Sequence, residues 1–126
     1  MARVTPDEFL REYEAANRSH DLERVLRLVH DDAVYWFSDG KSHCGRAAIA
    51  RAIRSNFDTI EAEDYRIEDV AWLARDGDFP ACTYRFVWSG VIGGTPASGA
   101  GRGTCVLARR ADSWAVLHEH LSQGVV

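Results

Sequence analysis

His118 and His120, near the end of the chain, are the two residues whose type and spacing best suggest a catalytic or ligand-binding role. They stand one residue apart in the alternating stretch "SWAVLHEHLS", so in a strand both would lie on one face. An imidazole ring titrates near neutral pH, which suits acid–base catalysis in a pocket. Three other interpretations stay open: a structural pair that hydrogen-bonds its neighbours, a pair exposed at the surface, or two metal ligands completed by His43 or Asp39.

Strict alternation along this stretch predicts which side chains accompany the histidines. One face is expected to hold Trp114, Val116, His118, His120 and Ser122, and the other Ala115, Leu117, Glu119 and Leu121. With a three-residue turn ahead of the stretch, the expected cross-strand pairs are Val106 with His118, Thr104 with His120 and Arg102 with Ser122. A turn of another length would shift the pairing by one position and change the neighbours of the histidines.

Aromatic side chains supply a second clue. Tyr84, Phe86 and Trp88 alternate in "ACTYRFVWSGVI", and their rings either fill the core of a curved sheet or line an apolar ligand pocket. A buried indole nitrogen requires a hydrogen-bond partner, so Trp36 and Trp88 are stronger candidates for pocket residues than Phe86. An arginine beside such a pocket either faces solvent or binds a ligand carboxylate through its planar fork. The candidate ligand-binding residues are Tyr13, Trp36, Tyr84, Trp88, Arg102 and Thr104.

Three predicted helices precede most of the predicted strands. A capping-box pattern at Thr5 and Glu8 predicts a helix that ends near His20. Apolar residues at helical spacing predict a shorter helix over 21–29 and a third over 45–57.

The strands are predicted from alternating β-branched and aromatic residues between turn signals. They span 33–38, which stops at the turn Asp39-Gly40, and then 65–74, 81–92, 101–111 and 113–122. The last four should form an antiparallel meander, and the Gly-rich segment "GGTPASGA" is expected to be a loop within it. The fold class is therefore α+β: a curved antiparallel sheet wraps round three N-terminal helices to give a cone.

Composition limits the classes of function. A chain of 126 residues is long enough for one core, so we expect a single domain over 1–126. A net charge of -4 excludes nucleic acid as the expected partner, because phosphate binding requires a concentrated basic face. Three widely spaced cysteines predict reduced thiols in a cytoplasmic protein. No stretch approaches the roughly 18 apolar residues of a membrane span, so no membrane partner is expected.

Several common catalytic motifs are not found. The Gly-rich "GGTPASGAGRG" lacks the Lys and the following helix of a phosphate-binding loop. There is no G-x-S-x-G sequence, which the nucleophile elbow of a serine hydrolase requires. We expect neither a metal nor a cofactor.

The order of elements and the ending "GRGTCVLARRADSWAVLHEHLS" resemble the SnoaL-like domains of the nuclear transport factor 2-like superfamily, whose cone-shaped fold is shared with ketosteroid isomerase. The W-x3-H-x-H-x-S spacing from Trp114 to Ser122 is also similar to that of the association domain of calcium/calmodulin-dependent protein kinase.

This resemblance implies a pocket at the mouth of the cone for a small hydrophobic or aromatic molecule, and homodimers formed through the outer face of the sheet. It implies functions from isomerase, cyclase or hydrolase catalysis to binding alone. Ketosteroid isomerase-like members use an Asp as general base, for which Asp39 is the nearest candidate here. The candidate catalytic residues are thus His118, His120 and Asp39, and a non-enzymatic association module remains the alternative.

Overall fold

The structure is a computed structural model that describes residues 3–123. Residues 1, 2 and 124–126, which the expected single domain also includes, lie outside the described residues. In chain order the elements are α1 (Pro6–Ser19), α2 (Leu22–Leu26), β1 (Val29–Trp36), β2 (Ser42–Cys44), α3 (Arg46–Thr59), β3 (Glu61–Ala74), β4 (Ala81–Ile92), β5 (Thr95–Arg110) and β6 (Ser113–Gln123).

The first helix begins where the sequence predicts. Thr5 Oγ1 accepts a hydrogen bond from the Glu8 amide, and Glu8 Oε1 accepts one from the Thr5 amide, so the capping box is confirmed. The helix ends at His20, whose φ of 58° is left-handed and stops helical propagation. One stripe of α1 is buried and carries Phe9, Leu10, Tyr13 and Ala16.

Several predicted boundaries are wrong, including the starts of the first strand, which begins at Val29, and of β3, which begins at Glu61. The second helix stops at Leu26, because Val29 already pairs with β6 as the first residue of β1. The short strand β2, which the sequence analysis missed, pairs antiparallel with β1. The Gly-rich segment belongs largely to β5, which starts at Thr95. Gly93 and Gly94, both at positive φ, supply the two-residue hairpin turn that makes this possible.

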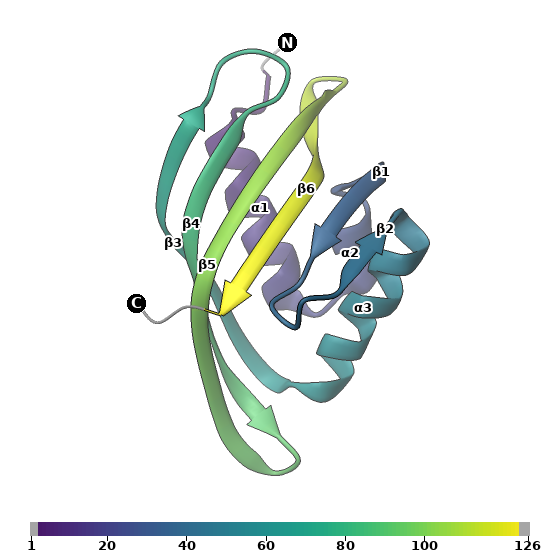
Figure 1. Cartoon of the computed structure of the whole chain (residues 1–126), viewed down its shortest axis with the longest axis vertical. Helices are drawn as coiled ribbons and strands as arrows, with labels where there is room; N and C mark the ends of the chain where they lie inside the picture. The colour runs from purple at the N-terminus through teal and green to yellow at the C-terminus, as the bar shows by residue number, and fades with distance from the viewer. Residues whose placement is uncertain (1–2, 124–126) are drawn as a thin grey trace.

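The six strands form one curved sheet in the order β2-β1-β6-β5-β4-β3. Strands β3 to β6 pair antiparallel in sequence order, so the predicted meander is confirmed. The first strand joins the far edge of this meander by pairing parallel with β6. Figure 1 shows the long strands curving past α1, while α3 lies beside β1 and β2. The α+β fold class with N-terminal helices and a curved sheet is thereby confirmed.

A stripe of glycines on β5 gives the concave face room for aromatic rings. The rings of Tyr84, Phe86 and Trp88 on β4 lie directly over Gly103, Gly101 and Gly99, respectively. A Cβ atom at Gly99 would stand 2.6 Å from Trp88 Nε1, closer than real Cβ contacts allow. The glycines are thus required by the close approach of these rings, which identifies the concave face.

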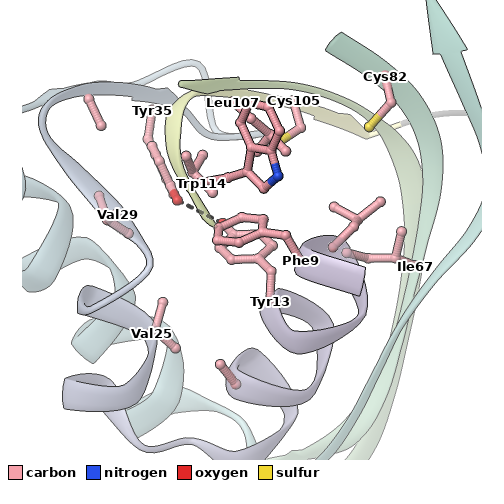
Figure 2. Packing of buried hydrophobic residues seen from close by; sticks show 14 of the residues in the cluster. Phe9, Tyr13, Val25, Val29, Tyr35, Ile67, Cys82, Cys105, Leu107 and Trp114 are labelled. Carbon is pink, nitrogen blue, oxygen red and sulfur yellow. Dashed lines mark hydrogen bonds between the residues drawn. The ribbon is translucent and has the colours of Figure 1, made fainter. Parts of the chain in front are cut away.

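The core lies between α1 and this concave face. Figure 2 shows Phe9 and Tyr13 of α1 pointing toward the sheet, with Trp114 and Leu107 above them. A dashed line in the figure joins Tyr13 to Tyr35 across the core. Among residues 3–123, no helix has the length and hydropathy required to span a membrane.

Candidate functional site

A β-bulge in β6 decides which side chains of that strand reach the interior. Val106 pairs with His118, whereas the next residue of β5, Leu107, pairs with Val116, so Leu117 is an extra residue in β6. A bulge of this kind reverses the alternation of faces that follows it. Trp114 and Val116 therefore face the core before the bulge, and Glu119 faces it after the bulge.

The interior of the cone contains a cavity of about 250 Å³ between the concave face of the sheet, α1 and α3. Aromatic and aliphatic side chains form most of its wall, and carboxyl, amide and hydroxyl groups are set among them. The lining residues are Tyr13, Asn17, Tyr35, Phe37, Ser38, Asp39, Ile53, Asn56, Phe57, Ile60, Glu63, Tyr65, Phe86, Trp88, Glu119, Leu121 and Gln123. Such a mixture of apolar wall and few polar groups is typical of small-molecule sites.

Glu119 is the polar centre of the cavity. Its side chain is buried, with 4% of the residue exposed, and it lines the cavity from β6. Tyr13 donates a hydrogen bond to Glu119 Oε1 over 3.0 Å, and Tyr84 donates one to Oε2 over 2.8 Å. Tyr35 lies 2.8 Å from the Tyr13 hydroxyl, oxygen to oxygen, and donates to it when Tyr13 donates to the carboxylate. With Tyr65 beside Tyr84, all four tyrosines of the chain gather around one carboxyl group.

Burial makes this carboxyl group an unusually weak acid. Loss of hydration raises the pKa of Glu119 from its ordinary value of 4.5 to about 7, although the hydrogen bonds from Tyr84 and Tyr13 oppose the rise. Burial also raises the pKa of each surrounding tyrosine well above 10. The hydroxyl groups therefore stay neutral donors, while Glu119 exchanges its proton near neutral pH.

A second polar group lies closer to the end of α1. His20 Nε2 is 2.6 Å from Glu63 Oε1, and the His20 ring stacks on Phe57 with 4.2 Å between ring centroids. Burial raises the pKa of Glu63, which the contact with His20 opposes. Asp39 contributes a third carboxyl group from the exposed turn after β1, where its Oδ1 accepts from the Lys41 amide.

The sequence comparison identifies the family of this cone-shaped domain. The family of SnoaL-like domains matches residues 7–126, which is nearly the whole chain. The chain belongs to this SnoaL-like family. No curated protein sequence matches this SnoaL-like domain significantly.

Solved structures confirm the fold of this SnoaL-like domain. A candidate aromatic ring hydroxylase from Novosphingobium aromaticivorans superposes with a TM-score of 0.86 at 18% identity, over 98% of this chain and 90% of that chain. A nuclear transport factor 2-like superfamily protein from Salmonella enterica gives 0.84 at 16% identity, over 94% and 88%. A candidate calcium/calmodulin-dependent protein kinase type II association domain from Thiobacillus denitrificans gives 0.83 at 22% identity, over 99% of each. At these identities the likeness shows the fold alone.

Four of the residues predicted from the sequence lie at the cavity of this SnoaL-like domain. Tyr13 and Trp88 line its wall, and Asp39 lies at its rim. Tyr84 stands behind the wall, where it donates to Glu119.

The other predicted residues lie on the outer face of the sheet. His118 and His120 flank the edge of the exposed Trp36 ring, with centroid distances of 5.0 and 5.1 Å. His118 Nδ1 donates to the Val34 carbonyl oxygen over 2.7 Å, and Arg102 is exposed. The predicted pairs of Thr104 with His120 and Arg102 with Ser122 are confirmed, although the predicted three-residue turn is wrong. Arg110 pairs with Ser113 across a two-residue turn, and the extra residue of the bulge restores the predicted register. The expectation that His118 and His120 line the cavity is wrong, because the bulge turns both side chains outward.

The metal interpretation of the histidine pair lacks a third ligand among the residues that the structure describes. Among residues 3–123, no three His, Cys, Asp or Glu side chains gather in a way that could hold a metal ion. The exposure of His120 and the hydrogen bond of His118 instead match the structural and surface interpretations.

Proposed function

We propose that this SnoaL-like domain binds a small, largely hydrophobic organic molecule in the cavity and exchanges a proton with it through Glu119. The reaction class would be cofactor-independent acid–base catalysis of the isomerase, cyclase or hydrolase type. The observation that carries the proposal is the carboxyl group of Glu119, which is buried at the cavity and held by Tyr13 and Tyr84, and whose pKa burial raises to about 7. Strongly perturbed carboxyl groups in cavities are candidates for general acids and bases.

The arrangement around Glu119 suits proton transfer. A general acid or base is most effective when its pKa lies near the working pH, because both protonation states are then populated. Tyr13 and Tyr84 hold one carboxylate oxygen each, so the carboxyl plane is fixed relative to the cavity. Fixed geometry lowers the entropy that a bound substrate must lose to reach the reactive arrangement.

The aromatic wall supports a ring-containing substrate. Phe57, Phe86 and Trp88 present rings to the cavity from α3 and β4. Flat rings pack well against such walls in offset or edge-on geometry. One neighbour in the structure comparison carries a name that refers to aromatic rings, which agrees with this substrate class.

The test is a ligand screen by thermal shift, followed by turnover assays of the compounds that bind. A panel of steroids, polyphenols, terpenoids and small aromatic compounds is measured against the wild type. A ligand at about 100 times its dissociation constant stabilises a protein by roughly 2.7 kcal/mol, which is about 10 °C for a chain of this length. Leu121→Trp fills the cavity and should abolish the shift. His120→Trp places the same ring on the opposite face and should not.

For a compound that is turned over, Glu119→Gln should lower kcat by about 10² to 10⁴. Glu23→Gln is the control, since Glu23 is exposed on α2, away from the cavity. Absence of any stabilising compound, or full turnover by Glu119→Gln, would contradict the proposal.

We also propose that two copies associate through the outer face of the sheet. The Trp36 side chain is 44% exposed there. Its ring contacts those of His118 and His120, and the three rings form one aromatic surface on the outer face of the sheet. Exposed aromatic surface of this kind favours contact with a partner. Light scattering should give the mass of a dimer for the wild type and of a monomer for Trp36→Asp. A dimer that binds no compound of the panel would support the association-module alternative.

A further inference from the structure

The cavity has a pronounced charge character. Three carboxyl groups line it, those of Asp39, Glu63 and Glu119. None of the lining residues within 3–123 is Lys, Arg or His. Glu63 has a hydrogen-bonded partner in His20, which approaches from outside the lining. For the described residues, no basic side chain lies within 4.0 Å of the carboxylate oxygens of Glu119 or Asp39.

Among the described residues, the side chains that donate hydrogen bonds to Glu119 are therefore neutral hydroxyl groups only. Removing a charge from water costs several kcal/mol unless an opposite charge compensates for it. Tyr13 and Tyr84 each donate one hydrogen bond, and neither can supply a positive charge. A cation placed in the cavity beside Glu119 would supply the missing charge, whereas an anion would add a second like charge in a poorly hydrated space.

The aromatic wall adds a second, independent preference for a cation. Each ring has a negative face, so a positively charged group is attracted to it. Cages of aromatic rings are a common way for proteins to recognise ammonium groups. The rings that line the cavity are those of Tyr13, Tyr35, Phe37, Phe57, Tyr65, Phe86 and Trp88.

We propose that the ligand of this cavity carries a basic nitrogen, as in a small aromatic or alicyclic amine, and that organic acids of the same shape are excluded. The inference rests on the proposed function, since it names the ligand class of the same site. The ammonium group lies against Glu119, and the hydrophobic part contacts the rings nearer the rim. A volume of about 250 Å³ is below the roughly 300 to 1,000 Å³ of drug-sized sites, so the ligand has one or two rings.

Binding of an amine is coupled to the protonation of Glu119. Below pH 7 the carboxyl group holds its own proton and must release it to pair with an ammonium group. Amine affinity should therefore rise about tenfold from pH 6 to pH 8, where the ionised fraction rises by that factor. The titratable groups that face Glu119 stay protonated over this range, because burial raises the pKa of each: Tyr13, Tyr35, Tyr65, Tyr84, Cys82 and Cys105.

The experiment compares three probes of nearly equal shape by titration calorimetry: 2-phenylethylamine, 2-phenylethanol and phenylacetate. At pH 8 the wild type should bind the amine at least about tenfold more tightly than the alcohol, and the acid should not bind measurably. In Glu119→Gln the advantage of the amine over the alcohol should fall to about twofold, while the alcohol keeps its affinity. Glu23→Gln should behave as the wild type.

The pH profile of the wild type provides a readout that needs no variant. The amine should bind about tenfold more tightly at pH 8 than at pH 6, and the alcohol equally at both. Binding of the alcohol or the acid as tightly as the amine would overturn the inference and leave the proposed function standing. If none of the three probes and no compound of the thermal-shift panel binds, both are overturned.

Discussion

Replacement of Glu119 by Gln should make the protein more stable at alkaline pH, although it removes a hydrogen-bonded residue from the core. The reason is the cost of ionising a buried carboxyl group that lacks a cationic partner among residues 3–123. Below pH 4.5 the group is protonated in both the folded and the unfolded chain, so it contributes no pH dependence. Between pH 4.5 and about 7 the unfolded chain releases this proton while the folded chain retains it. The free energy of unfolding therefore falls as the pH rises through this window.

The magnitude follows from the two pKa values. A rise from 4.5 to about 7 corresponds to about 3 kcal/mol of stability lost between pH 4.5 and pH 8. Glutamine is close in shape to the protonated carboxyl group and cannot ionise, so the variant lacks this loss. At pH 4.5 the two proteins should be about equally stable. At pH 8 the variant should be more stable by about 3 kcal/mol, or roughly 10 °C in Tm.

The assay is urea unfolding followed by tryptophan fluorescence at half-unit steps between pH 4.5 and 8.5. At each pH the free energy of unfolding of the wild type is subtracted from that of the variant. The contributions of groups that titrate alike in both proteins then cancel. Glu23→Gln serves as the control for the loss of a negative charge from an exposed position. A difference between Glu119→Gln and wild type that stays constant within about 1 kcal/mol over this range would refute the reasoning, since Glu119 would then titrate as in the unfolded chain.

The remaining predictions concern the glycine stripe and the outer histidines. Gly101→Ala should destabilise the protein by about 2 kcal/mol, because the new methyl group overlaps both the Phe86 ring and the carbonyl oxygen of Ser122, which is part of the backbone and cannot rotate away. Equal urea midpoints for variant and wild type would contradict this. His118→Ala should cost about 1 kcal/mol through its lost hydrogen bond to the Val34 carbonyl group, whereas His120→Ala should change stability by less than about 0.5 kcal/mol. Both variants should bind cavity ligands with dissociation constants within about twofold of the wild-type value. A loss of binding in titration calorimetry would show instead that the histidines belong to the ligand site.

Local signals in the sequence predict much of the fold. The capping box at Thr5 and the apolar stripe of α1 are short-range patterns, and both are found in the structure. The boundaries that failed depend on distant partners. Val29 fits the apolar stripe of a short helix, but it pairs with Val116, which lies far along the chain. Secondary-structure propensity, summed over a short stretch of sequence, does not detect a contact between residues so far apart.

The candidate site depends even more on distant contacts. Tyr13, Tyr35, Tyr65 and Tyr84 come from α1, β1, β3 and β4, and each is plausible by itself as a core aromatic. Their convergence on Glu119 joins residues separated by as many as 106 positions in the chain. A buried tyrosine requires a hydrogen-bond partner for its hydroxyl group, so the sequence predicts that some polar group accepts from these tyrosines. It does not by itself name that group.

The face that Glu119 occupies follows from two features together, the glycines of β5 and the pairing of β5 with β6. Glycines at alternate positions of one strand, Gly99, Gly101 and Gly103, pack under large rings of the neighbouring strand and so mark the concave face. The predicted pairing of Thr104 with His120 places both residues on the opposite face, because Thr104 directly follows Gly103. The histidines then face outward and the residue between them, Glu119, faces inward. Strict alternation from Trp114 gave the other answer because a bulge leaves no mark in residue types. The pairing of Thr104 with His120 holds because the extra residue of the bulge offsets a turn that is one residue shorter than predicted.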